Sequence, residues 1–253
     1  MEQRTRHLFV ARQFGDRSIR PVARLSMFRS PVATRYLFAY LPEVKEISEF
    51  SPFLSFPELG TVYESDELFP FFENRVMVRN RPEFSEFVAS LNLDEKAEPF
   101  EILERSGGPR ETDNIEVFPE PEYDPASGLH TCRFFVRGLR YSEGAFEAAG
   151  TLSAGQLLTL QPEPNNSADP LAVAINAPSG SRLGWVPRYL TRYVHQAISE
   201  CDTSTIRLSV EKVGGTDGGA HTRLMVQLSC CWVKLPWPFG VEACNPLVEV
   251  AQV

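Results

Sequence analysis

The sequence has no apolar run that approaches the roughly 20 residues needed to cross a bilayer. A secretory leader is not expected either, because Arg4, Arg6 and His7 lie within Met1–Val10 and no long uncharged stretch follows. The five cysteines are odd in number and show no C-x-x-C spacing, which argues against a disulfide framework and a structural zinc. We therefore expect a cytoplasmic protein with reduced thiols, no membrane contact, and no metal or other cofactor.

Motifs of the common enzyme families are also missing. The sequence contains no G-x-x-x-x-G-K-[ST], G-x-G-x-x-G, H-E-x-x-H or G-x-S-x-G. The four histidines are scattered, and we expect them on the surface or on helix faces rather than as catalytic bases. We predict that the protein is not an enzyme. A nuclease or phosphotransferase whose residues meet only in space is the least favoured alternative.

Charge is unevenly distributed along the chain. Residues 1–40 contain 8 Lys and Arg against 2 Asp and Glu, whereas residues 41–130 contain 7 against 21. Residues 131–253 contain 10 of each, so the net charge of −8 comes from the middle of the chain. An acidic segment repels a phosphate backbone and suits a basic partner protein. A solvated acidic face on ordinary helices is the other interpretation.

The first half predicts a small antiparallel β-meander followed by helices. Short runs rich in Val, Leu, Phe and Tyr predict strands over residues 7–14, 18–27, 34–41 and 115–118. Three helices are expected between the last two strands: one capped by Ser65, one beginning at Pro82, and one from Pro99 to the Gly107-Gly108 pair.

Residues 119–129, P-E-P-E-Y-D-P-A-S-G-L, are Pro-rich and polar and mark a domain boundary. We therefore expect a domain over 1–118, a linker over 119–129, and a domain over 130–253 with a C-terminal extension from 235. The second domain has many short strands, a helix over 187–199 and a Gly-rich hairpin loop over 214–220. This pattern predicts a small, curled, barrel-like sheet, so the fold class is α+β.

Three segments between residues 133 and 190 carry a family resemblance: R-F-F-V-R-G-L-R-Y, then L-Q-P-E-P-N-N-S-A-D-P-L-A-V-A-I, then R-L-G-W-V-P-R-Y-L. Together they resemble the HIRAN domain, over about residues 130–235. The resemblance implies a modified OB-like barrel that grips the 3′ end of single-stranded DNA.

Two neighbouring residues suit a terminal nucleotide. Tyr141 offers a flat face on which a base can stack, and Arg140 can pair with a phosphate. The family's helicase members carry two tyrosines in a row, and a further aromatic after the Asn pair. Here Ser142 and Ala168 stand at those positions, so half of the base sandwich is missing.

The remaining candidate residues lie in P-N-N-S-A-D and just after it. Asn165 and Asn166 can bond to sugar or backbone oxygens, and Arg188 lies near a basic position of the family pattern. Asp169 would be repelled by an internal phosphate but can accept a hydrogen bond from a terminal 3′-hydroxyl. The alternative is that Asn165, Asn166 and Asp169 simply build a tight loop.

A second resemblance covers the first half. The runs S-P-F-L-S-F-P-E-L, S-D-E-L-F-P-F-F-E-N-R, P-F-E-I-L-E-R-S-G-G and I-E-V-F-P-E resemble the N-terminal subdomain of HipA-type serine/threonine kinase toxins, without the kinase lobes. Detached pieces of this kind occur in three-gene toxin–antitoxin operons, as the antitoxin or its helper. The resemblance implies two partners, a HipA-like kinase and a helix-turn-helix DNA-binding antitoxin. We expect the first domain to dock on the kinase through an acidic surface within residues 41–118, although the individual contact residues are unknown. The rival hypothesis is a stand-alone DNA-end-binding protein of DNA repair or phage defence.

Overall fold

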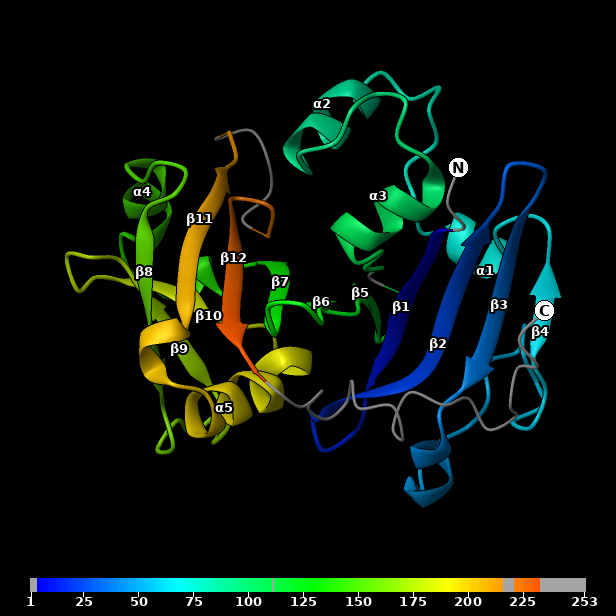
Figure 1. The fold of residues 1–253 in the computed structure, drawn as a ribbon, viewed down its shortest axis with the longest axis horizontal. Helices are drawn as coiled ribbons and strands as arrows, with labels where there is room; N and C mark the ends of the chain where they lie inside the picture. Colours follow the sequence, from blue (N-terminus) through cyan, green and yellow to red (C-terminus); the bar gives the residue numbers. More distant parts are fainter. Residues whose placement is uncertain (1–3, 111, 216–220, 233–253) are drawn as a thin grey trace. The chain divides into compact units, whose positions relative to one another are not determined.

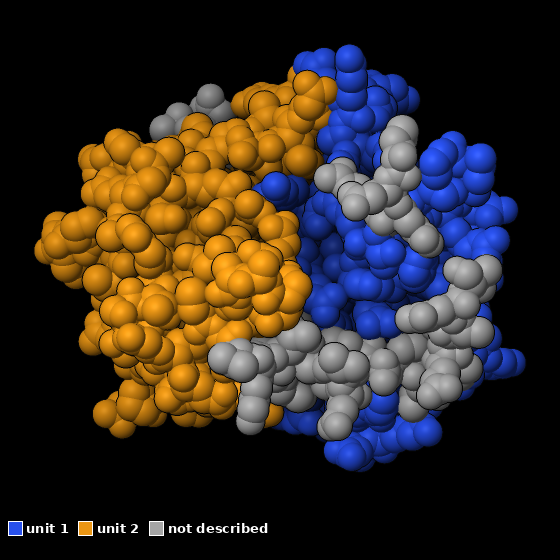
Figure 2. All heavy atoms as spheres, viewed as in Figure 1, with its two compact units in different colours: residues 1–84, 95–120, 238–253 blue, residues 85–94, 121–237 orange. Residues whose placement is uncertain are grey.

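The computed structural model describes residues 4–110, 112–215 and 221–232. It forms two compact units, one of residues 4–84 and 95–120 and one of residues 85–94 and 121–232 (Figure 2). The change between them at Glu120 and Pro121 lies inside the segment that the sequence marks as a boundary. The expected C-terminal extension 235–253, and residues 216–220 of the expected hairpin loop, lie outside the described residues.

Five antiparallel strands form the sheet of the first unit, in the order β4-β3-β2-β1-β5 (Figure 1). Their bounds are Arg4–Gln13 (β1), Ile19–Arg29 (β2), Thr34–Tyr40 (β3), Tyr63–Ser65 (β4) and Ile115–Pro119 (β5). The first three strands pair with their neighbours in sequence, which confirms the predicted β-meander.

Aromatic side chains fill the core on one face of this sheet. Phe38 on β3 stacks on Phe56, with ring centroids 3.8 Å apart. The buried Tyr40 hydroxyl accepts a hydrogen bond from the Phe53 amide at 2.7 Å and donates one to the Phe56 carbonyl at 2.8 Å. These bonds hold the turn Phe53–Phe56 from inside the core, while Leu54 at its tip is fully exposed at 101%.

The helices of the first unit are short. They are α1 (Pro70–Glu73), α3 (Pro99–Ser106) and a 3₁₀ turn, η1 (Pro42–Glu46). The predicted helix capped by Ser65 is wrong, because Ser65 ends β4 and the helix starts only at Pro70. A residue before proline is disfavoured in helical geometry, so Phe69 stays outside the helix.

The third predicted helix is confirmed. α3 begins at Pro99 and is closed by Gly107 in the left-handed conformation, with φ of 76°. At its other end Glu98 and Glu101 form a reciprocal capping box. The helix expected from Pro82 begins two residues later, as α2 (Phe84–Ser90), and most of it belongs to the second unit.

Seven antiparallel strands form the sheet of the second unit, in the order β10-β9-β8-β11-β12-β7-β6 (Figure 1). Their bounds are Glu122–Asp124 (β6), Leu129–Phe135 (β7), Leu157–Pro162 (β8), Val173–Asn176 (β9), Arg182–Trp185 (β10), Arg207–Val213 (β11) and Leu224–Cys231 (β12).

One bridge brings the far parts of this sheet together. Beyond β7, Arg137 and Trp185 of β10 exchange both backbone hydrogen bonds, at 2.8 and 2.9 Å. Because β10 is an end strand and β7 lies near the opposite end, this bridge curls the sheet back on itself. The predicted barrel-like sheet is therefore confirmed.

Short helices complete the second unit: η2 (Leu139–Tyr141), α4 (Ala145–Gly150), η3 (Arg188–Leu190), α5 (Thr191–Glu200) and η4 (Thr203–Thr205). α5 realises the helix predicted over 187–199 and buries Tyr193, Val194 and Ala197. α4 is not predicted by the sequence. The Arg223 guanidinium lies 4.5 Å from the centroid of the Phe146 ring of α4.

In the described part of the chain, no helix is long and apolar enough to cross a membrane.

Two features near residue 125 differ from what the sequence led us to expect. The segment 119–129, predicted as a linker, contains a short strand, because β6 pairs with the start of β7, and the Asp124 side chain accepts a hydrogen bond from the Ala126 amide at 3.0 Å. His130, expected at the surface, is fully buried on β7 between the rings of Tyr123 and Trp232. Burial there lowers the pKa of His130.

Candidate functional site

The turn that follows β7 carries Arg140 and Tyr141. It begins at Gly138, whose φ of 77° lies in the left-handed region. A Cβ atom at Gly138 would lie 2.7 Å from the Trp185 ring, so glycine is required by both backbone angle and space. Leu139 is buried and anchors the turn, whereas Tyr141 remains 71% exposed.

Arg140 and Tyr141 form a pair on the surface. The Arg140 guanidinium lies 4.7 Å from the centroid of the Tyr141 ring, and Arg140 Nη2 donates a hydrogen bond to the Tyr141 hydroxyl at 2.6 Å. A cation over an aromatic face restrains both side chains. The turn therefore presents an aromatic ring and a positive charge at the same point.

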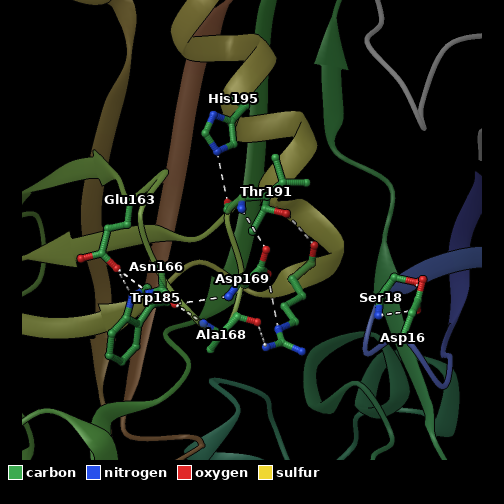
Figure 3. Close-up of polar contacts among 11 residues, drawn as sticks. Asp16, Ser18, Glu163, Asn166, Ala168, Asp169, Trp185, Thr191 and His195 are labelled. Carbon is green, nitrogen blue, oxygen red and sulfur yellow. Dashed lines mark hydrogen bonds and ion pairs between the residues drawn. The ribbon is translucent and has the colours of Figure 1, made fainter.

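Asn166 organises the loop between β8 and β9. Its Oδ1 accepts hydrogen bonds from the amides of Ala168 at 2.9 Å and Asp169 at 3.2 Å (Figure 3). An Asn side chain that bonds to the backbone two residues later is the usual Asx turn. The loop-building alternative is thus the geometry observed for Asn166, whose amide group faces into the loop.

Asp169 has partners on two sides. Its Oδ1 accepts a hydrogen bond from the Leu171 amide at 2.9 Å, and its Oδ2 lies 3.4 Å from Nε of Arg188. Arg188 also donates to the Ala168 carbonyl at 3.3 Å, which ties η3 to the loop. Asp169 and Arg188 are therefore brought together as an ion pair, with their side chains about a quarter exposed (21% and 32%).

The predicted residues thus form two groups. Arg140 and Tyr141 lie on one turn, and Asn166, Asp169 and Arg188 meet at the loop. Asn165 is exposed on the same loop and takes no part in the hydrogen bonds described above.

These two groups are connected by three residues that the sequence analysis did not name as candidates: Glu163, Arg182 and Trp185. Glu163 accepts hydrogen bonds from Nε1 of Trp185 at 2.8 Å and Nδ2 of Asn166 at 2.9 Å, and it pairs with Arg182 at 2.8 Å. Arg182 also lies over the Trp185 ring, 5.4 Å from its centroid. Glu163 and Trp185 stand inside the quoted family segments, but only the curled sheet brings them together.

The ionisation of Glu163 follows from these contacts. Burial by itself would raise the pKa of its carboxyl, but the hydrogen bonds from Trp185 and Asn166 and the charge of Arg182 outweigh burial and lower the pKa. Glu163 is therefore an anion at neutral pH.

Across the described ranges, no group of three or more His, Cys, Asp or Glu side chains could hold a metal ion.

Comparison with known protein families gives a match within the second unit. The model of the HIRAN domain family matches residues 129–223. This part of the chain is a HIRAN domain. The match includes all six predicted site residues, and it confirms the sequence resemblance for this unit. It leaves the resemblance of the first half as a prediction.

Two solved structures are similar to part of the chain. One is a protein from Lactobacillus plantarum, 22% identical, with 39% of this chain and 89% of that chain covered and a TM-score of 0.31. The other is the HIRAN domain of human HLTF, 23% identical, with 40% and 72% covered and a TM-score of 0.28. No curated protein matches the sequence.

Proposed function

We propose that the HIRAN domain of this chain binds the 3′ end of single-stranded DNA without catalysing a reaction. The observation that carries the proposal is the turn of Arg140 and Tyr141, where a ring that is 71% exposed stands beside a guanidinium. Base–aromatic stacking contributes roughly 1–3 kcal/mol per base and does not depend on sequence. Arg140 adds a donor for the phosphate of the stacked nucleotide.

Asp169 gives this site a means of recognising the chain end. A carboxylate offers about four acceptor positions, so bonds to the Leu171 amide and Arg188 leave room for one hydroxyl donor. A 3′-phosphate would meet like charge at the same point. Arg188 offsets part of that repulsion, so we expect a preference for the 3′-hydroxyl end of about tenfold rather than exclusion of the phosphate.

Fluorescence polarisation with two oligonucleotides, identical except for a 3′-hydroxyl or a 3′-phosphate, tests the proposal. Tyr141→Ala should weaken binding of both strands about tenfold or more, whereas Tyr141→Phe should retain most of the affinity because the ring remains. Asp169→Asn retains an acceptor for the Leu171 amide but loses the charge, so it should abolish the preference between the ends. Absence of binding at high micromolar protein, or equal wild-type affinity for both ends, would contradict the proposal.

A second proposal concerns the first unit. We propose that this unit docks on a HipA-like kinase, as an antitoxin or accessory subunit that acts beside a helix-turn-helix DNA-binding antitoxin. The turn Phe53–Phe56 presents Leu54 to solvent while the Tyr40 hydroxyl holds the turn in place. A preorganised apolar side chain loses little entropy on binding, and the excess of acidic residues over 41–130 favours a basic partner.

Co-purification of the full chain with a truncated HipA-like kinase from a neighbouring gene tests this docking. Leu54→Asp should abolish the complex, whereas Val32→Asp should preserve it, since Val32 is equally exposed at 93% in the same unit. The complex should also weaken at high salt. A complex that survives Leu54→Asp, or the absence of any complex, would favour the stand-alone DNA-end-binding protein. In either case the purified chain should show no ATP turnover, because it has no phosphate loop.

A further inference from the structure

One carboxylate in the second unit, that of Glu163, contacts three donor residues, two on β10 and one in the loop between β8 and β9. Oε2 of Glu163 accepts from Trp185 on β10 and from Asn166 in the loop, and Oε1 pairs with Arg182 at the start of β10 (Figure 3 draws the first two bonds). The Glu163 side chain is 20% exposed. Hydrogen bonds to a charged, partly buried group are about twice as strong as those between neutral groups.

Asn166 connects Glu163 to the residue that would read the DNA end. While Nδ2 of Asn166 donates to Glu163, its Oδ1 receives the amides of Ala168 and Asp169. The orientation of the Asn166 amide group is therefore set by Glu163. Without that acceptor Nδ2 of Asn166 loses its partner, and only the two backbone amides of Ala168 and Asp169 still hold the amide group in place.

Trp185 connects Glu163 to the stacking turn. Its ring lies against Gly138, where an added Cβ would approach within 2.7 Å, and Gly138 begins the turn that carries Arg140 and Tyr141. The backbone of Trp185 also pairs with Arg137, one residue before that glycine. The Nε1 bond to Glu163 fixes the ring in the plane that supports the turn.

We propose that Glu163 is a positioning residue that sets the geometry of the Asn166–Asp169 loop and couples it to the turn of Arg140 and Tyr141. The inference rests on the proposed binding of a DNA 3′ end and deepens it. Glu163 itself does not contact the DNA. Its loss affects discrimination between the two ends, because Asp169 is displaced, while the exposed Tyr141 ring still stacks on any base.

Three variants of the full chain separate these effects by fluorescence polarisation. Glu163→Ala should reduce the preference for a 3′-hydroxyl over a 3′-phosphate from about tenfold to less than about twofold, while the mean affinity for the two strands changes less than about threefold. Glu163→Gln keeps one acceptor oxygen and should retain part of the preference. The control Glu147→Gln changes an exposed glutamate on α4 and should behave as the wild type.

A double-mutant cycle tests the coupling. If Glu163 acts through Asp169, the double variant Glu163→Ala/Asp169→Asn should lose no more of the preference between the two ends than the single variant that loses more of it. Additive losses, or a Glu163→Ala variant that keeps the wild-type preference, would overturn the proposal. A uniform loss of affinity for both strands without loss of preference would overturn it as well.

A measurement without DNA keeps the inference distinguishable from the proposed function. In Glu163→Ala, amide hydrogen exchange over residues 164–172 should accelerate about tenfold or more, and the Trp185 indole N–H resonance, assigned by Trp185→Phe, should shift. Unchanged exchange in the loop would refute the positioning role even if DNA binds. If the wild type binds neither strand, the proposed function fails, and the exchange rates alone decide the role of Glu163.

Discussion

Tyr40→Phe removes a single oxygen atom from the core of the first unit. That oxygen accepts from the Phe53 amide at 2.7 Å and donates to the Phe56 carbonyl at 2.8 Å. Tyr40 is fully buried, and burial raises the pKa of its hydroxyl to about 12. No solvent reaches the position to replace the lost bonds.

The expected cost follows from the two backbone groups left behind. The turn bond between the Phe56 amide and the Phe53 carbonyl remains, but the Phe53 amide and one lone pair of the Phe56 carbonyl lose their partner. A buried polar group without a partner costs about 1–3 kcal/mol, and a carbonyl that has lost one bond costs less than an amide. We therefore expect Tyr40→Phe to reduce the free energy of unfolding of the first unit by about 2–4 kcal/mol.

Tyr63→Phe is the matched control. The Tyr63 hydroxyl also accepts a backbone amide, that of Glu58 at 2.7 Å, but this bond is exposed to solvent. Water can replace it, so the cost should be less than about 1 kcal/mol. Urea titrations followed by amide hydrogen exchange and mass spectrometry would measure both variants, with peptides of β11 and β12 as the internal reference.

Equal destabilisation by the two variants would refute this account of the turn. So would a Tyr40→Phe protein whose peptides over β1–β3 exchange at the wild-type urea midpoint. If the account holds, Tyr40→Phe should also loosen the turn that presents Leu54 and weaken kinase docking without a change at the docking surface.

Two further predictions concern single residues. Gly138→Ala should destabilise the second unit by about 2–4 kcal/mol, because the new Cβ meets the Trp185 ring and the residue has a positive φ. Gly144 has a similar φ of 68° but open space around it, so Gly144→Ala should cost only about 1–2 kcal/mol. Thermal unfolding would measure both variants. Similar costs for the two would show that the Trp185 contact is not important. Burial, with a smaller effect from Arg24, lowers the pKa of His7 from 6.5 to about 4. The unfolded chain therefore binds the extra proton first, and the stability of the first unit should fall by up to about 3 kcal/mol as the pH drops from about 6.5 to about 4. His7→Gln should flatten this dependence in urea titrations at several pH values, and an unchanged slope would exclude His7 as its source.

Local signals were sufficient where an element is decided by a few neighbouring residues. Pro99 and Gly107 predicted both ends of α3, because a proline at the first turn and a left-handed glycine act within the helix itself. The tight loop that P-N-N-S-A-D offered as an alternative to DNA contact is local for the same reason, since Asn166 bonds to amides only two and three residues away. The strands of the meander follow from short runs of apolar residues joined by short turns.

Contacts between distant residues were decided only by the tertiary structure. Glu163 meets Trp185 across 22 residues, and Arg137 pairs with Trp185, because the second sheet curls until its far parts touch. The burial of His130 depends on Tyr123 and Trp232, which reach it from different elements. The sequence by itself determined the HIRAN segment and its candidate residues, since these lie in short, recognisable runs. The closure of the sheet decides which of these residues lie close together. It also brings Glu163 into contact with Trp185. No local sequence pattern encodes this closure.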